Sequence, residues 1–142
     1  MNRQNEWHLD ERLAAEAARR ADLPLSTLLL RNEHRFPWVV LVPRREDVSE
    51  SFDLGEADRA ALWSEVDRVA AALKTETGAT KINIAAFGNI VPQLQVQVVA
   101  RHPEDPAWPG SAVGWAPAAP YGDGGVPPFW PGLLSRLDLS ER

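Results

Sequence analysis

The sequence predicts an α+β domain built on an antiparallel β-sheet, with one long helix packed on the sheet. Two apolar, β-branched runs joined by a hairpin-sized link, one long amphipathic helical pattern and two later alternating runs all indicate this class. With 142 residues the chain is long enough for one domain. Its 44% hydrophobic and 25% charged residues are typical of a globular protein.

The first predicted element is a short helix between Leu9 and Pro24. Asp10 is a suitable N-cap, and apolar residues recur four positions apart at Leu9, Leu13 and Ala17. Pro24 prevents the helix from continuing, because proline lacks the backbone N–H that a helix interior needs.

Two buried strands are predicted next, over Leu25–Asn32 and Trp38–Arg44, joined by the link NEHRFP. Pro37 and Pro43 bracket the second strand, as prolines can at strand ends. A long helix follows in the segment 54–78, where an apolar stripe recurs at helical spacing and Gly78 is a natural terminator. The stripe consists of Leu62, Val66, Val69 and Leu73.

Two further strands are predicted, over Lys81–Phe87 and within the segment 91–101. In the second strand, Gln93, Gln95 and Gln97 alternate with apolar residues, so the three amides share one face. The pattern alone predicts that the apolar face packs on the long helix while the amides face water.

After Arg101 the chain becomes rich in proline, glycine and tryptophan, which excludes long regular elements. Trp108, Trp115 and Trp130 favour a segment wrapped over the domain, because such large apolar side chains usually pack on something. Trp108 and Trp115 are candidates for a pocket lid, although anchoring in the core is the preferred interpretation. A short helix is expected within residues 129–140.

The composition argues against several classes of function. The net charge of −5 and the short basic clusters argue against a partner that is a long nucleic acid. The absence of cysteine excludes thiol catalysis and cysteine-ligated zinc. No apolar run is long enough for a membrane helix, and the N-terminus lacks a signal-peptide pattern. We therefore expect a cytoplasmic protein without membrane association.

Several segments resemble the histidine triad (HIT) superfamily, and more closely a bacterial branch of HIT-like proteins. In chain order they are LDERLAAE, DLPLSTLLLRNEHRFPWVVLVPRR, KINIAAFGNIVPQLQVQVVAR and DPAWPG. The resemblance implies the HIT fold, commonly joined to a second copy across a two-fold axis, so that a homodimer is expected. It places a HIT-like domain in residues 1–110 and leaves 111–142 as an extension packed on it.

The same resemblance implies the candidate site. In active family members a histidine at the position of Gln95 attacks a phosphate and carries a transient nucleotidyl group, while Gln93 and Gln97 match the outer histidines. Further nucleotide or phosphate contacts are implied for Asn32, Asn83 and Asn89. Imidazole has an available lone pair near neutral pH, whereas the nitrogen of a carboxamide has delocalised its pair. Glutamine can hold a phosphate oxygen but cannot attack phosphorus, so no catalytic residue is intact.

None of the histidines is expected to replace the missing nucleophile. His102 has the wrong parity for the glutamine face, and His8 and His34 lie near a helix start and in a hairpin. No histidine pair has metal-ligand spacing, so neither a metal site nor a cofactor is expected.

Three hypotheses follow from the sequence. The first is a degenerate HIT protein that binds a nucleotide or a related phosphorylated metabolite without the covalent mechanism. The second is a slow nucleotidyl hydrolase, acting on a dinucleoside polyphosphate or a nucleoside phosphoramidate with water as the nucleophile. The third is a partner-binding protein with a vestigial pocket, in which the segment from Trp108 to Trp130 carries the interaction.

Overall fold

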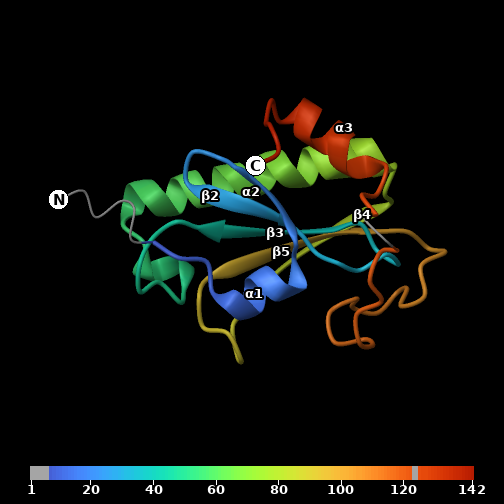
Figure 1. Cartoon of the computed structure of the whole chain (residues 1–142), viewed down its shortest axis with the longest axis horizontal. Coiled ribbons are helices and arrows are strands. Elements are labelled where there is room, and N and C mark those ends of the chain that lie inside the picture. The colour runs from blue at the N-terminus through green and yellow to red at the C-terminus, as the bar shows by residue number, and fades with distance from the viewer. Residues whose placement is uncertain (1–6, 123–124) are drawn as a thin grey trace.

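The computed structural model, which describes residues 7–122 and 125–142, contains a five-stranded antiparallel sheet in the order β1-β2-β3-β5-β4 (Figure 1). The predicted α+β class with a long helix on an antiparallel sheet is confirmed. The elements are α1 (Glu11–Glu16), β1 (Arg19–Asp22), β2 (Ser26–Leu30), β3 (Trp38–Pro43), η2 (Ser51–Asp53), α2 (Glu56–Thr77), β4 (Lys81–Phe87), β5 (Gln95–Arg101) and α3 (Phe129–Arg136).

The N-terminal region differs from the prediction of one helix between Leu9 and Pro24. Asp10 caps α1 by accepting a hydrogen bond from the Arg12 backbone N–H, but the helix ends at Glu16. The chain then forms β1, in which Ala21 is fully buried while Asp22 is exposed. Pairing with β2 buries alternate residues of this segment. Tertiary packing therefore overrides its helical propensity.

The hairpin of β2 and β3 forms the middle of the sheet, as the apolar runs predicted. Every residue of both strands is buried, because helices or loops cover both faces. The connecting loop brings Arg31 opposite Trp38, with the Arg31 backbone N–H bonded to the Trp38 carbonyl at 3.0 Å. The residues that flank this loop therefore meet at one end of the sheet.

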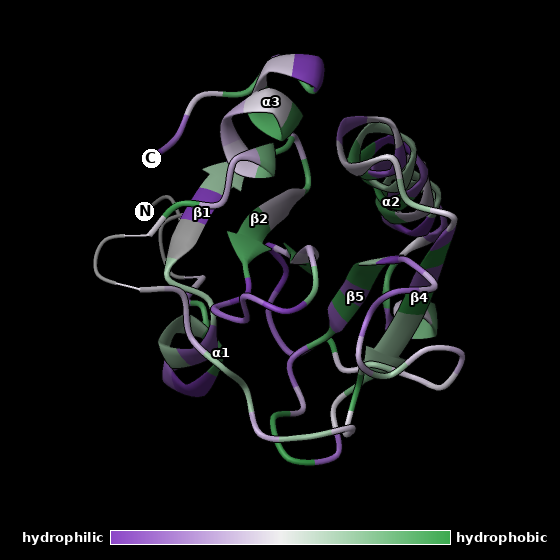
Figure 2. Ribbon diagram, turned by 90° about the vertical axis from the view of Figure 1, so that its right-hand side faces the viewer, coloured by the Kyte–Doolittle hydropathy of each residue, from purple (hydrophilic) through white to green (hydrophobic). Residues whose placement is uncertain are grey.

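The long helix α2 covers one face of the sheet together with α3 (Figure 2). Its C-cap Gly78 adopts a left-handed conformation with φ of 67°, as expected for a helix-terminating glycine. Glu65 fixes the helix to the sheet: its buried carboxylate accepts hydrogen bonds from the backbone N–H groups of Leu25 and Ser26. The predicted stripe of α2 is buried here against Val96 and Val98 of β5.

A second apolar cluster lies on the opposite face of the sheet, between the strands and α1. Leu13 of α1 packs there with Val40 of β3, Val99 of β5 and Ala112 of the C-terminal segment. The sheet thus separates two cores, and the second core stands beside the candidate site.

The proline-rich C-terminal segment wraps over the domain, and its three tryptophans have different environments. Trp130 at the start of α3 is fully buried, Trp108 is half-buried, and Trp115 is 42% exposed. No helix within residues 7–122 and 125–142 is long and apolar enough to cross a membrane.

Candidate functional site

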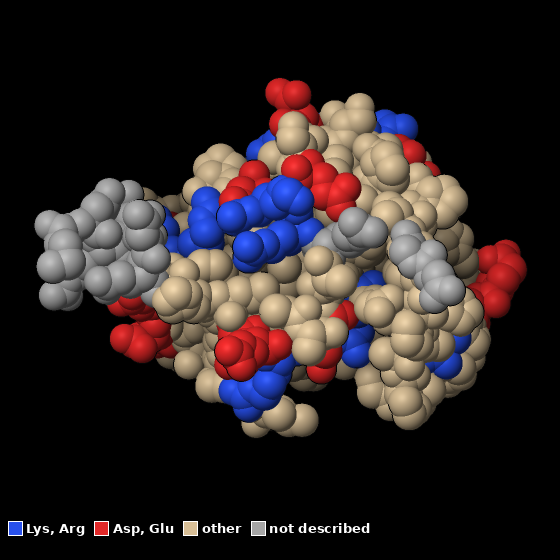
Figure 3. Space-filling model, in the orientation of Figure 1, with Lys and Arg blue, Asp and Glu red and all other residues tan. Residues whose placement is uncertain are grey.

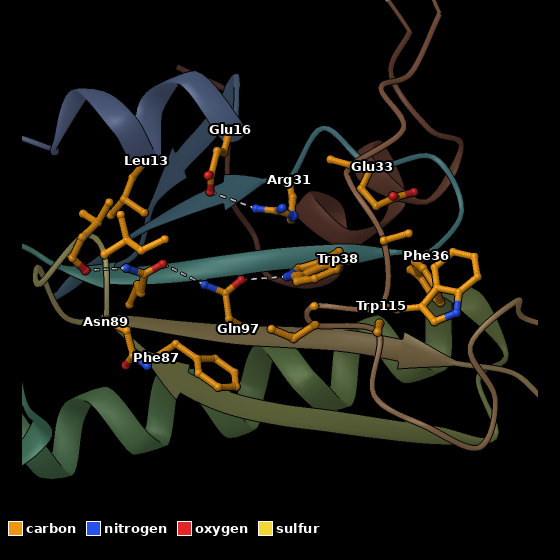
Figure 4. Close-up of a pocket in the computed structure, with 18 of the residues that line it drawn as sticks. Leu13, Glu16, Arg31, Glu33, Phe36, Trp38, Phe87, Asn89, Gln97 and Trp115 are labelled. Carbon is orange, nitrogen blue, oxygen red and sulfur yellow. Dashed lines mark hydrogen bonds and ion pairs between the residues drawn. The ribbon is translucent and has the colours of Figure 1, made fainter.

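A cavity of about 480 Å³ opens on the sheet face that carries α1 (Figure 4). Its walls come from α1, the loop between β2 and β3, the turn before β5 and the C-terminal segment. Apolar side chains form much of the lining, among them Leu13, Phe36, Trp38, Phe87 and Trp115. The polar side chains in the lining are Arg12, Glu16, Arg31, Glu33, Arg35, Asn89, Gln95 and Gln97.

Gln95 and Gln97 lie side by side at this cavity, on β5. The expectation from pattern alone, that these amides face water, is wrong: Gln95 is 7% exposed and Gln97 is 6% exposed. Antiparallel pairing places Gln95 opposite Phe87 of β4, and Gln97 between Val40 of β3 and Ala85 of β4. Because side chains alternate along a strand, Val96 and Val98 point into the core under α2.

A directed chain of hydrogen bonds runs through the two amides. The indole Nε1–H of Trp38 donates to Gln97 Oε1 at 2.7 Å, and Gln97 Nε2 donates to Gln95 Oε1 at 3.0 Å. Gln95 Nε2 then donates to the backbone carbonyls of Val91 at 3.1 Å and Gln93 at 3.3 Å. An indole N–H only donates and a carbonyl only accepts, so both ends of the chain fix the orientation of both amides.

The structure does not bring Gln93 to this cavity. The predicted strand within 91–101 begins only at Gln95, and Gln93 lies in the preceding bend. Its amide holds the segment before α1 instead: Oε1 accepts from the Asp10 N–H, and Nε2 donates to the His8 carbonyl, both at 2.9 Å.

Of the three candidate asparagines, only Asn89 lines the cavity. The Asn32 side chain accepts a hydrogen bond from the Tyr121 backbone N–H at 2.9 Å and so ties down the C-terminal segment. Asn83, on β4, accepts from Nη1 of the buried Arg101 at 2.8 Å. Both of these asparagines therefore serve contacts outside the cavity.

No histidine is among the described residues that line the cavity. His102 turns away from the glutamine face, as its parity predicted, and its Nε2 lies 3.2 Å from the Thr77 carbonyl. His8 and His34 are exposed. Over the described parts of the chain, no three His, Cys, Asp or Glu side chains group closely enough to hold a metal ion.

The charged and aromatic groups at and beside the loop between β2 and β3 were not predicted from the sequence. Arg31 places its guanidinium 4.6 Å from the centre of the Trp38 ring, and its Nη1 donates to Glu16 of α1 at 2.9 Å. The available signal was their position: Arg31 and Trp38 flank a predicted hairpin loop, and antiparallel pairing brings such residues together.

Glu33, in the same loop, holds the C-terminal segment over the cavity. Its carboxylate is 2% exposed and accepts hydrogen bonds from the Arg35 side chain, the Arg35 N–H and the Ala119 N–H. Burial alone would raise the pKa of Glu33, but these hydrogen bonds and the charge of Arg35 give a net lowering from its ordinary value. We call residues 111–121, which this contact secures, the C-terminal strap.

Trp115 of the strap lines the cavity, so for this residue the lid interpretation describes the structure better than core anchoring. Its ring lies 6.1 Å from that of Phe36 in an edge-to-face arrangement and 5.0 Å from the Arg35 guanidinium. Trp108 instead lies beside the buried Arg101, 5.8 Å from its guanidinium, and outside the lining.

A second depression is polar and basic, and Figure 3 shows Lys and Arg side chains gathered beside acidic ones on the face it views. Three of its arginines form ion pairs with neighbouring carboxylates. Arg44 and Arg142 both pair with Asp22, and Arg45 pairs with Asp58. The cavity above β5 is therefore the better candidate site, since it combines aromatic walls with buried amides.

Comparison with known proteins points to one family. Residues 15–104 match the family model described as HIT domain. A histidine triad (HIT) protein from Sinorhizobium meliloti 1021 is similar in structure with a TM-score of 0.81 and 47% identity, over 83% of this chain and 87% of that one. A histidine triad protein from Bradyrhizobium japonicum gives 0.80 and 43%, with the same coverage of 83% and 87%. One from Marinobacter aquaeolei VT8 gives 0.79 and 37%, over 81% and 84%. No curated protein matches the chain significantly.

Proposed function

Because the chain belongs to the histidine triad (HIT) family, we propose that its cavity binds a nucleotide or a related phosphorylated metabolite without covalent chemistry. The cavity volume of about 480 Å³ suits a ligand of this size. Its aromatic walls, among them Phe36, Trp38 and Trp115, offer stacking surface for a base, and its arginines offer charge for a phosphate.

One observation supports the proposal that the bound ligand undergoes no covalent chemistry. Gln95 stands where the resemblance puts the nucleophile, and its amide nitrogen is held by two backbone carbonyls. A carboxamide has no nucleophilic lone pair at nitrogen, and these bonds further point its N–H groups at the backbone. A ligand phosphate in this cavity is therefore bound and released unchanged.

Calorimetry with AMP, GMP and diadenosine polyphosphates tests the proposal. We expect saturable binding of at least one of them, weakened in Val113→Trp, which adds a large side chain to the cavity wall. The melting temperature of that variant shows whether it folds. Silence across the whole panel at millimolar ligand removes the proposal.

We also propose that the protein forms a homodimer through β4. This strand lies at an edge of the sheet, and Ile84 and Phe87 on it are 44% and 49% exposed. A strand edge carries unpaired backbone N–H and C=O groups, which favours pairing with another strand. Pairing of β4 with its copy would continue the sheet across a two-fold axis and cover these apolar side chains.

A further inference from the structure

Among the described residues, three arginines line the cavity, and two of them are committed to partners within the protein. Arg12 makes two side-chain hydrogen bonds to Asp10, and its Nη1 donates to the Ile90 carbonyl. Arg35 binds the buried Glu33 through Nε and Nη2 and also donates to the Pro117 carbonyl. Both guanidinium groups thus serve the architecture of the cavity rim.

Arg31 is different, because only one nitrogen of its guanidinium has a protein partner among the described residues. Nη1 pairs with Glu16, a carboxylate that is 57% exposed and therefore a weak partner. Nε is buried and has no hydrogen-bond partner in the described parts of the chain. A guanidinium has five N–H groups, so most of the binding capacity of Arg31 is unused.

The face of Trp38 supports this guanidinium at 4.6 Å, which holds the charge at the cavity wall. The side chain of Arg31 is only 21% exposed, so an anion that reaches it meets a partly desolvated cation. Under these conditions a charge-assisted contact to a phosphate is stronger than at an open surface.

Gln95 and Gln97 differ from Arg31 in that they offer the ligand mainly hydrogen-bond acceptors. Both N–H groups of Gln95 and one of Gln97 are used within the hydrogen-bond chain that starts at Trp38. What remains is one N–H of Gln97 and a lone pair on each carbonyl oxygen. A surface with two acceptors and one donor suits an uncharged group that carries hydrogen-bond donors better than it suits a phosphate.

We propose that Arg31 holds the anionic group of the ligand, while Gln95 and Gln97 face an uncharged part of it that donates hydrogen bonds. This inference rests on the proposed function, because it concerns how the same cavity divides one phosphorylated ligand. The sequence suggested that the glutamines of β5 bind the phosphate. In this proposal Gln95 and Gln97 instead contact a hydroxyl or amino group of the ligand, and the phosphate lies at Arg31.

Affinities for AMP and adenosine, measured in the full chain, test this division. Their ratio reports what the phosphate contributes. Arg31→Met should lower that ratio by about tenfold or more, because AMP loses its phosphate contact while adenosine has no anionic group to lose one. Gln97→Met should weaken both ligands and preserve the ratio.

Arg68→Met, on the exposed surface of α2, removes the same charge away from the cavity and should leave the ratio as in wild type. Arg31→Gln provides a second neutral variant should Arg31→Met fail to fold. A ratio that survives in both Arg31 variants but collapses in Gln97→Met overturns the inference and leaves the proposed function standing. Failure of AMP and adenosine alike to bind, along with the rest of the nucleotide panel, overturns both.

Discussion

Trp38 contributes to the cavity through two different parts of its side chain. The ring face supports the Arg31 guanidinium, and the indole N–H donates to Gln97 at 2.7 Å. The first contact holds a charge at the wall, and the second determines which atoms of the amides face the cavity. A single residue at the start of β3 therefore couples the two chemistries of the site.

Replacing Trp38 with phenylalanine separates these two roles, because an aromatic face remains, although a smaller one, and the N–H is lost. The carbonyl of Gln97 is then buried without its donor, and we expect the free energy of unfolding to fall by about 1–3 kcal/mol. Urea denaturation measures the change. Trp63→Phe, on the partly exposed surface of α2, is the matched control and should cost clearly less. Equal losses in the two variants would contradict the role of the N–H.

Gln95→His should place an imidazole in the glutamine row without restoring turnover. The Val91 carbonyl, which now accepts from Gln95 Nε2, would accept Nδ1–H of the imidazole and leave the lone pair of its Nε2 available. Because Arg31 holds the phosphate away from this row, we expect the variant to hydrolyse an adenosine phosphoramidate no faster than wild type. Mass spectrometry should detect no nucleotidylated protein in either. An adduct at position 95 of the variant would place the phosphate at the row and contradict the assignment to Arg31, and an adduct in wild type would show that an amide is not disabling.

At this scale the sequence predicted part of the site. Parity along β5 correctly placed Val96 and Val98 in the core and turned His102 away from the glutamine face. Sequence spacing could not predict that Gln95 and Gln97 are buried, because their cover comes from α1 and the strap, far away in the chain. Arg31 was missed for a related reason: its environment depends on Trp38 and Glu16, which only the folded chain brings to it.

Among the elements, the strap depends most on one short loop. Residues 31–37 bind it through the carboxylate of Glu33, the side chain of Asn32 and the N–H of His34, which donates to the Ala119 carbonyl. The strap has no helix or strand of its own, so its position follows from these contacts. The position of Trp115 and of the cavity wall that it forms therefore depends on the loop of residues 31–37.

The lowered pKa of Glu33 makes this attachment sensitive to acid. A carboxyl with a depressed folded pKa contributes stability that is present above its unfolded pKa, whose ordinary value is 4.5, and that is lost as pH falls through the folded pKa. Glu33→Gln should cost about 2 kcal/mol at neutral pH. We expect its difference from wild type to shrink as pH drops below about 4.5.

Denaturant titrations of both proteins from neutral pH down to about pH 3 measure this difference. Glu16→Gln, which removes an exposed ion pair, is the control and should change stability by less than about 0.5 kcal/mol at neutral pH. If the free energies of unfolding of wild type and Glu33→Gln differed by the same amount at every pH, Glu33 would not be the source of the acid sensitivity.

Element prediction failed in one place for a physical reason. The segment 9–24 has the composition of a helix, yet its second half is β1, the outer strand beside β2. The alternation of Arg20, Ala21, Asp22 and Leu23 was the signal for a strand. In the sequence, the helical propensity of the segment was given more weight than this alternation. In the folded protein, pairing with the edge of β2 decides the structure instead.

For the whole molecule, the open edge at β4 is the feature with the largest consequence. Dimerisation through it predicts that Ile84→Lys shifts the protein towards the monomer, because a charge is then placed in the interface. Light scattering coupled to size-exclusion chromatography measures the mass. Phe52→Lys, on a side chain that is 72% exposed outside the sheet, is the control. A wild type that is monomeric at all concentrations would contradict the proposal.

The two-sided packing of β5 has a consequence for how such a protein changes over time. Even-numbered residues of this strand anchor the layer under α2, while Gln95 and Gln97 belong to the other side. Substitutions in the row that faces the cavity can therefore change what the site binds without touching the side chains that anchor β5 under α2. The limit on such changes is the hydrogen-bond chain from Trp38, which any new side chain at these positions would have to replace.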